Sequence, residues 1–217
     1  SNPTGCVYTQ DELKEIARVC VAKKLLVISD EIYEKLIYDN LKHTSIASFG
    51  KDIYDLTVTV NGLSKSHSMT GWRNGYLGGP CDIVGAISKL QDHSTSNPTS
   101  ISQKAAVAAL KPQNDADFSK DMCREFQRRR DYILSRLRGM EKIGFVVPKG
   151  AFYIFCDIEK VNMNSATFAN RLLDEVGVAV IPGIGFGRDD YVRISFATST
   201  AQIEKGMDRI QEWLNKL

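Results

Sequence analysis

The stretch TQDELKEIARVCVAKKLLVISDEIY, residues 9–33, decides the fold class of this chain. Thr9 and Glu12 have the spacing of a capping box, which predicts that a helix begins at residue 10. Apolar residues then recur at helical spacing as far as residue 23. The uninterrupted apolar run at residues 25–29 has the length of a strand and is typical of a buried parallel strand. A helix followed by such a strand indicates an α/β fold.

The same grammar continues beyond this stretch. Residues 56–61, Leu-Thr-Val-Thr-Val-Asn, predict a second strand, and residues 82–91 and 102–110 carry helical patterns. Turn residues at 111–115 then interrupt the apolar periodicity. We therefore place a domain boundary between residues 114 and 115, which gives domains over residues 1–114 and 115–217.

The second domain opens with a long, heavily charged helix predicted over residues 118–138. Its run of three arginines at 128–130 is interpreted as a solvated face. Short strands are predicted at residues 145–147, 151–157, 178–181 and 191–197, with a helix at 167–175. A capping box formed by Ser199 and Gln202 starts the last helix. This order indicates a small α+β unit behind a connecting helix.

The composition narrows the classes of function. Of the 217 residues 43% are apolar, and 28 basic residues face 26 acidic ones, so a globular protein with a buried core is expected. The charge is too balanced for a nucleic-acid partner, and neither an apolar run of about 20 residues nor a leader suggests a membrane or secretion. Small anionic ligands remain compatible with this composition.

The cysteines and histidines indicate neither a disulfide framework nor a metal site. The five cysteines are widely spaced and include no CxxC pair, so we expect reduced thiols in a cytoplasmic protein. His43, His67 and His93 never fall at the close spacing of a zinc site. Surface positions, or positions behind a site, are the preferred interpretation for all three.

Two polar clusters follow the two predicted apolar strands directly. Asp30 and Tyr33 come after the first strand, and Ser64, Lys65 and Arg73 come after the second. Taken singly, Asp30 would be interpreted as a helix cap and Tyr33 as a core residue. Lys65 would be a surface lysine, and Arg73 would belong to a structural ion pair. Because open α/β sheets bind ligands at the carboxyl ends of their strands, the joint placement favours a converging acid, phenol, amine and guanidinium.

This constellation suits an aldehyde cofactor with a pyridine ring and a phosphate. An amine such as that of Lys65 attacks an aldehyde when burial and nearby cations keep it neutral. A carboxylate such as Asp30 keeps a pyridine nitrogen protonated, and a phenol such as Tyr33 can hydrogen-bond the ring's 3-oxygen. Arg73 and Ser64 could provide part of a phosphate cradle.

Four motifs make the sequence recognisable. They are Asn-Pro-Thr-Gly at residues 2–5, Ser-Asp-Glu-Ile-Tyr-Glu at 29–34, Asn-Gly-Leu-Ser-Lys at 61–65 with Met-Thr-Gly-Trp-Arg-Asn-Gly-Tyr at 69–76, and Tyr-Val-Arg-Ile-Ser-Phe-Ala at 191–197. In this order and spacing they resemble the class I aminotransferases, which use pyridoxal 5′-phosphate (PLP) on fold type I. The resemblance implies an α/β fold: part of a large domain, with a mainly parallel sheet and flanking helices, followed by an α+β small domain.

The resemblance also implies roles for seven residues. Lys65 would be the Schiff-base lysine, Asp30 would face the pyridine nitrogen, and Tyr33 with Asn2 would bind the ring's 3-oxygen. The phosphate would contact Arg73 and Ser64. Arg193 would bind the substrate's α-carboxylate through a bidentate pair, and Asn2 would also contact the substrate. No metal is implied.

Two departures from the family pattern have consequences. The family often has serine three residues before the lysine, where this chain has Gly62, so one phosphate hydroxyl would be missing. The resemblance also begins about halfway along such enzymes, before which they carry the phosphate loop, the ring-stacking aromatic and part of the dimer interface. We therefore expect the isolated chain to bind PLP weakly and to turn over little.

For the intact enzyme, the resemblance implies a cytoplasmic homodimer that transfers an amino group, with aspartate as donor and 2-oxoglutarate as acceptor, by a ping-pong mechanism. Two alternatives remain. A PLP-dependent lyase or synthase on the same fold would use the same lysine, aspartate and tyrosine. A transcription regulator with an aminotransferase-like effector domain would need a DNA-binding helix-turn-helix upstream.

Overall fold

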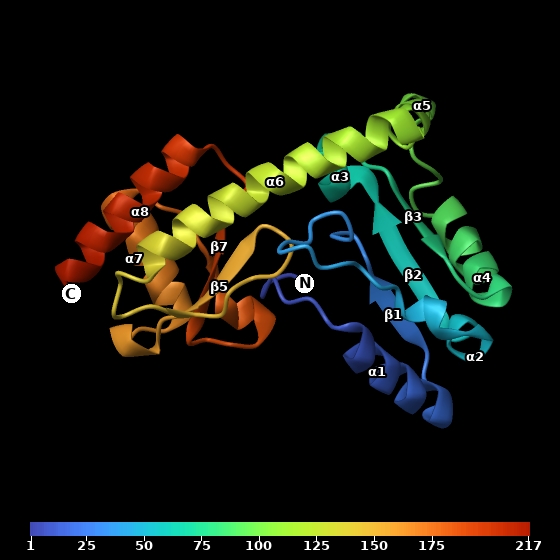
Figure 1. Ribbon diagram of the computed structural model, residues 1–217, viewed down its shortest axis with the longest axis horizontal. Helices are drawn as coiled ribbons and strands as arrows, with labels where there is room; N and C mark the ends of the chain where they lie inside the picture. The colour runs from blue at the N-terminus through green and yellow to red at the C-terminus, as the bar shows by residue number, and fades with distance from the viewer. The chain divides into compact units, whose positions relative to one another are not determined.

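The computed structural model describes the backbone of residues 1–217 and their side chains except at residues 113 and 115–117. The chain divides into two compact units (Figure 1). The lysine unit comprises Tyr8–Asp121, and the arginine unit comprises Ser1–Val7 with Met122–Leu217. The domain boundary expected between residues 114 and 115 adjoins side chains outside the described set, and it stays a prediction.

The lysine unit is built on a three-stranded sheet, in the order β1-β2-β3. β1 (Val27–Asp30) pairs in parallel with β2 (Thr57–Gly62), and β3 (Gly75–Gly78) pairs antiparallel with β2. Its helices and single helical turns are α1 (Gln10–Lys23), η1 (Ile46–Phe49), α2 (Lys51–Tyr54), α3 (Leu63–Ser66), η2 (Thr70–Trp72), α4 (Cys81–Asp92) and α5 (Ser100–Ala109). Strand β3 was not predicted from the sequence.

The first helix forms as the sequence predicts. Thr9 Oγ1 accepts a hydrogen bond from the Glu12 N–H at 3.3 Å, and Glu12 Oε2 accepts one from the Thr9 N–H at 2.7 Å, so the capping box is complete. Ala17 on the apolar face of α1 packs with Ile46 and Ile53 in a buried cluster. The predicted bounds, residues 10–23, are confirmed.

The prediction that the first strand is buried is wrong in this chain. The strand covers residues 27–30, and the side chain of Ile28 is 78% exposed, with Leu25 and Leu26 also largely exposed. The reason is that β1 forms the edge of its sheet and has one neighbour, β2, among the described strands. Its second edge and one of its faces therefore remain open.

The arginine unit contains a four-stranded antiparallel sheet in the order β4-β5-β7-β6. These strands are β4 (Gly144–Phe145), β5 (Tyr153–Asp157), β6 (Ile181–Pro182) and β7 (Tyr191–Ser195). Single helical turns lie at η3 (Glu159–Val161) and η4 (Gly183–Phe186), and the helices are α7 (Ser165–Val176) and α8 (Thr200–Asn215). The predicted small α+β unit is present, although β4 and β6 are shorter than expected.

One core supports this sheet. Ile154, Cys156 and Val192 are fully or almost fully buried on one face of β5 and β7. α7 and α8 contribute further buried residues: Phe168, Leu172, Ile203, Met207, Ile210 and Leu214. On α8 they recur every three or four residues, which is the spacing that the sequence analysis read as a helix face.

The long helix α6 (Pro112–Leu137) starts earlier than predicted and contributes to both units. Proline fits the first turn of a helix because its missing N–H has no intrahelical partner there. The solvated-face interpretation of the arginine run is wrong for Arg130, whose side chain is 5% exposed and whose Nη1 donates to the Pro148 carbonyl at 3.1 Å. Arg128 is exposed and pairs with Glu125. None of the described helices is long and apolar enough to cross a bilayer.

Candidate active site

The structure places the predicted cofactor residues at the ends of adjacent strands. Asp30 is the last residue of β1 and is in register with Val60 of β2. Its Oδ1 accepts a hydrogen bond from the Ile32 N–H at 3.3 Å, and its side chain is exposed. Tyr33 follows in the turn after β1, where its carbonyl accepts from the Leu36 N–H at 2.8 Å. Asp30 and Tyr33 thus both lie at the carboxyl end of β1.

Ser64, Lys65 and Arg73 lie on the single connection between β2 and β3. The connection closes at its base, where Gly62 pairs with Gly75 and Asn61 with Tyr76. Lys65 lies in the one-turn helix α3, directly after β2. Arg73 follows η2, and its Nη1 donates to the Thr70 carbonyl at 2.8 Å. Because both strands end at this loop, the amine and the guanidinium belong to one compact segment.

Gly62 marks a close approach of two backbones. A Cβ at this position would lie 3.0 Å from the Asn74 carbonyl oxygen and 3.1 Å from the Gly75 Cα. Serine here would require a shift of the β3 backbone by a few tenths of an ångström. The local packing therefore accounts for a glycine where the family pattern often has a hydroxyl.

In the arginine unit, the structure brings Asn2 and Arg193 together. Arg193 Nη1 donates to Asn2 Oδ1 at 2.6 Å, across 191 positions of sequence. Residues 1–7 are held nearby because the Gly5 carbonyl accepts hydrogen bonds from the N–H groups of Lys149 and Gly150, at 2.8 and 2.9 Å. The structure thus joins Asn2 and Arg193 by a direct hydrogen bond, a contact that the sequence did not predict.

The Arg193 guanidinium lies between aromatic rings. Its central carbon is 4.3 Å from the centre of the Tyr153 ring and 5.1 Å from that of Phe186, distances at which cations interact favourably with ring faces. Its Nε is buried and has no hydrogen-bond partner among the described residues. A guanidinium with donors to spare, held in a fixed plane, is suited to bind a carboxylate.

Phe186 is positioned by a buried serine. Ser165 Oγ donates to Asp189 Oδ1 at 2.7 Å and accepts from the Ile184 N–H at 3.1 Å, which fixes the turn η4 that carries Phe186. Ser165 is completely buried. Its hydroxyl therefore supports the wall of the Arg193 site from behind.

Replacing Ser165 with alanine is expected to lower the free energy of unfolding by about 1–3 kcal/mol, because Asp189 and the Ile184 N–H both lose a hydrogen bond to a completely buried hydroxyl. Urea denaturation measures this loss. Serine-to-alanine substitution at exposed Ser48 serves as the control, since its hydroxyl donates to a carbonyl on the surface. Equal losses for the two variants would contradict the assignment.

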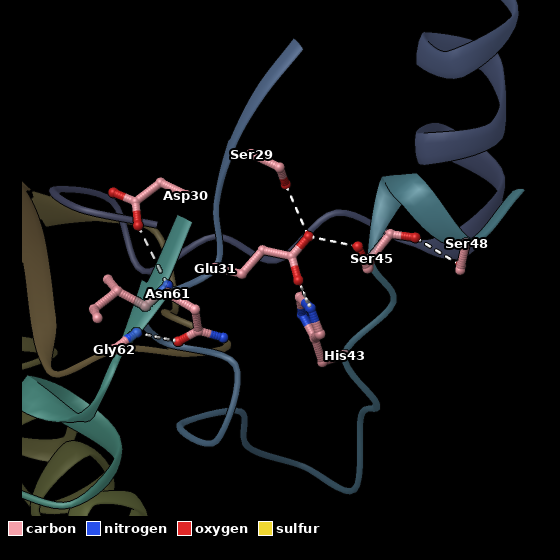
Figure 2. Close-up of polar contacts among 9 residues, drawn as sticks. Ser29, Asp30, Glu31, His43, Ser45, Ser48, Asn61 and Gly62 are labelled. Atoms are coloured by element: carbon pink, nitrogen blue, oxygen red, sulfur yellow. Dashed lines mark hydrogen bonds and ion pairs between the residues drawn. The ribbon is translucent and has the colours of Figure 1, made fainter. Parts of the chain in front are cut away.

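Beside Asp30 lies a buried carboxylate, that of Glu31, which was not predicted from the sequence. The Glu31 side chain is 6% exposed and accepts hydrogen bonds from Ser29 Oγ at 2.9 Å and Ser45 Oγ at 2.7 Å, and its other oxygen lies 2.8 Å from His43 Nε2 (Figure 2). Burial raises the pKa of Glu31, but these three hydrogen bonds outweigh burial and leave the pKa below its ordinary value. The hydrogen bond to Glu31 raises the pKa of His43. Sequence spacing gave no signal, because His43 is twelve residues away.

A histidine with two carboxylates can hold a metal ion, and Glu31, Glu34 and His43 have donor atoms within 4.8 Å of one another. The direct bond between Glu31 and His43 already accounts for their approach. Glu34 adds a nearby negative charge that raises the pKa of His43 further. We therefore interpret the group as an ion pair.

This pair should make stability depend on pH. The contribution of Glu31, whose pKa is lowered, is present above about pH 4.5, and that of His43, whose pKa is raised, is complete below about pH 6.5 and is lost as the pH rises through its folded value. Replacing His43 with glutamine should therefore cost most, about 1 kcal/mol, between these limits, and less at pH 8. Urea denaturation of both proteins from pH 5 to pH 8 measures the difference, and a cost that does not vary with pH would contradict it.

Comparison with known proteins gives the family. The profile of the family "Aminotransferase class I and II" matches residues 1–210. The chain is 45% identical, over 220 residues, to an aspartate aminotransferase of Geobacillus stearothermophilus, and 43% identical, over 219 residues, to one of Bacillus sp. (strain YM-2). Each alignment covers 99% of this chain and 55% of the relative. The chain thus spans about half the length of the curated relatives it matches.

Solved structures give the same result. An aromatic aminotransferase from Pyrococcus horikoshii superimposes with a TM-score of 0.94 at 42% identity, over 99% of this chain and 58% of that one. An aspartate aminotransferase from Thermus thermophilus with maleate gives 0.91 at 38% identity, over 98% and 54%. The predicted fold class, part of a fold type I large domain followed by an α+β small domain, is confirmed. The chain belongs to the family of class I and II aminotransferases.

Proposed function

We propose that this chain forms the cofactor-binding lysine segment and the carboxylate-binding segment of a PLP-dependent aminotransferase. The observation that carries the proposal is the placement of Asp30, Lys65 and Arg73 at the ends of three strands paired side by side. A carboxylate, an amine and a guanidinium in this order match the ring nitrogen, the aldehyde and the phosphate of PLP. The donor set therefore fits the cofactor.

Each of these residues has a distinct task in the proposed reaction. PLP, when bound, supplies an electron-withdrawing ring that makes the α-proton of an amino acid acidic. Lys65 Nζ would hold the cofactor covalently and, once released, would act as the general base that takes the substrate's Cα proton and returns it to the cofactor's C4′. Asp30 would keep a proton on the ring nitrogen and Tyr33 would bind the 3-oxygen, a task that the family resemblance also gives to Asn2. Arg73 and Ser64 would bind the phosphate.

Arg193 binds the α-carboxylate that amino acid and oxo acid substrates share. Its Nη1 already contacts Asn2, and its plane is fixed by Tyr153 and Phe186, so the remaining donors are oriented before the substrate arrives. Because both substrates use the same anchor in turn, the amino donor must leave as an oxo acid before the acceptor binds. This order is a ping-pong mechanism.

Aspartate and 2-oxoglutarate are the proposed substrates. Several of the similar proteins are named aspartate aminotransferases, and the Thermus structure contains maleate, which is a dicarboxylate like aspartate. Other relatives are named for prephenate or N-acetyl-LL-diaminopimelate. Specificity for the second carboxylate is therefore the part of the proposal that most needs a test.

The test uses a fusion protein, because the chain spans about half the length of its relatives. The part of the Geobacillus relative that precedes the matched region is placed before Ser1, and the fusion is incubated with PLP, aspartate and 2-oxoglutarate. Formation of glutamate and oxaloacetate supports the proposal. Pyruvate or ammonia without glutamate would favour a lyase instead. The fused segment alone is the control.

The isolated 217-residue chain should bind PLP weakly and show little or no turnover. Its open β1 edge and exposed apolar side chains indicate surfaces that a larger domain covers. Stoichiometric PLP retained by the isolated chain, together with transaminase activity, would overturn this expectation. Absorbance after gel filtration measures the retained cofactor.

We also propose that the enzyme works as a homodimer in the cytoplasm. All five cysteines are free thiols, and burial raises the pKa of Cys156 to about 12, so this thiol stays protonated and inert. Such cysteines suit a reducing compartment. Sedimentation of the fusion protein tests the dimer, and a monomer with full activity would exclude it.

A further inference from the structure

Glu31 is anchored through both its backbone and its side chain. Its N–H donates to the Val60 carbonyl at 2.9 Å, which extends the pairing of β1 with β2 by one residue. Its carboxylate takes one hydroxyl donor from β1, at Ser29, and two partners from the segment that follows, at His43 and Ser45 (Figure 2). The side chain therefore ties the end of β1 to a segment more than ten residues away.

The neighbouring carboxylate points the other way. Successive side chains of an extended strand alternate between its two sides, and Figure 2 shows Asp30 and Glu31 directed to opposite sides. The turn that leaves the strand is closed by the Ile32 N–H on Asp30 Oδ1 at 3.3 Å and by the Glu34 N–H on the Glu31 carbonyl at 2.9 Å. Any rotation of the backbone at Glu31 would therefore move Asp30 and this turn together.

Burying an ionised carboxylate costs desolvation free energy, so it stabilises a fold inefficiently. Well-packed apolar side chains often stabilise as much as a buried ion pair or more, whereas directional hydrogen bonds can select one conformation. Ser29, His43 and Ser45 all hydrogen-bond Glu31, which lies between Asp30 and the turn that carries Tyr33. The network therefore controls geometry at the place where the proposed cofactor residues leave the sheet.

We propose that Glu31 is a positioning residue, whose buried carboxylate fixes the backbone that directs Asp30 and Tyr33 toward the cofactor. The inference rests on the proposed function, because the direction of these side chains matters only if they contact PLP. Glu31 itself points away from Asp30 and acts through the backbone. His43 and Ser45 share this task as its partners.

The first experiment needs no cofactor. Amide hydrogen exchange is measured by NMR in the 217-residue chain and in the Glu31→Ala, Glu31→Gln and Glu15→Ala variants. Glu15 is an exposed glutamate of α1 paired with Arg18, which makes it a matched control. In Glu31→Ala, exchange of the Ile32 and Glu34 amides should rise about tenfold or more, while the amides of β2 and α1 change less.

The glutamine variant separates geometry from simple loss of the side chain. Its amide oxygen can accept from Ser29 and Ser45, and its NH₂ group can donate to a neutral His43 ring. At pH 8, Glu31→Gln should therefore protect Ile32 and Glu34 nearly as well as glutamate does. Exchange that rises equally over β1, β2 and α1 in Glu31→Ala, or does not rise at Ile32 and Glu34, would overturn the proposal.

The second experiment measures the reaction of Lys65 with PLP. Each variant is incubated with millimolar PLP and reduced with borohydride, and mass spectrometry compares the pyridoxyl adduct at Lys65 with that at exposed Lys24. Glu31→Ala should need about tenfold more PLP for the same labelling of Lys65, whereas Glu31→Gln and Glu15→Ala should match the wild type. Unchanged labelling of Lys65 despite faster local exchange would make Glu31 a purely structural anchor.

The two readouts separate the inference from the function on which it rests. No preferential labelling of Lys65 in the wild-type chain, nor in the fusion protein, would overturn the proposed function, while hydrogen exchange would still report whether Glu31 fixes the turn. Preferential labelling of Lys65 that does not respond to Glu31→Ala would leave the function intact and overturn the positioning role.

Discussion

Replacing Lys65 with alanine in the fusion protein is expected to lower the rate of glutamate formation by roughly 10⁴-fold or more, because one amine performs two tasks. In the proposed reaction it would bind the cofactor covalently, and it would carry the proton between the substrate Cα and the cofactor. Lys65 lies directly after β2, in a loop closed by the pairing of Gly62 with Gly75. A coupled assay for oxaloacetate measures the rate.

Arginine at position 65 refines this test, since it keeps the positive charge but cannot attack an aldehyde at neutral pH. Both Lys65 variants should therefore be inactive, while Lys24→Ala, at the exposed end of α1, should keep full activity. Retention of more than a few per cent of activity by Lys65→Ala would exclude this lysine as the proton carrier.

Replacing Arg193 with lysine is expected to raise the KM for both aspartate and 2-oxoglutarate by roughly 10- to 100-fold, with a smaller change in kcat. A lysine ammonium keeps the charge, but it loses the planar fork and the stacking on Tyr153 and Phe186. Arginine-to-alanine substitution should lower kcat/KM further, by about 10²- to 10³-fold, because the carboxylate then has no charged partner.

Arg188 provides the control for this prediction. It also lies over an aromatic ring, that of Tyr191, but it is exposed and pairs with Asp190. Arg188→Lys should therefore leave both KM values within about twofold. If Arg193→Lys lowered kcat and left the two KM values unchanged, Arg193 would not be the shared carboxylate anchor.

Local signals predicted the elements that local interactions form. The helix over residues 10–23 is correct because its start is a hydrogen-bonded motif of two residues, Thr9 and Glu12, and its face is periodic. The start of the last helix was recognised for the same reason, with Ser199 accepting from the Gln202 N–H. Such features need no knowledge of distant residues.

Features that depend on distant partners were not predictable. An apolar run such as residues 25–29 has the same composition whether the strand is central or at an edge. The sequence therefore gives no sign that Ile28 is exposed. Arg130 is buried because the Pro148 carbonyl reaches it from 18 residues away. The antiparallel strand β3 is short and rich in glycine, which weakens any strand signal.

The candidate site divides in the same way. The positions of Asp30 and Lys65 at strand ends followed from the sequence, because strand ends are visible as changes from apolar to polar residues. The supporting groups were not visible: Glu31 reads as an ordinary surface glutamate until His43 and Ser45 are placed beside it. Which residues support a site depends on how the chain packs in three dimensions. Their spacing along the sequence does not reveal these contacts.

The hydrogen bond between Asn2 and Arg193 also has a consequence for biosynthesis. The two residues are 191 positions apart. At a translation rate of about 5–20 residues per second, a ribosome therefore adds Arg193 roughly 10–40 s after Asn2. The lysine unit, by contrast, draws all its strands from Tyr8–Asp121 and can assemble while translation continues. A nascent chain would therefore acquire its lysine segment well before it has an anchor for substrate carboxylates.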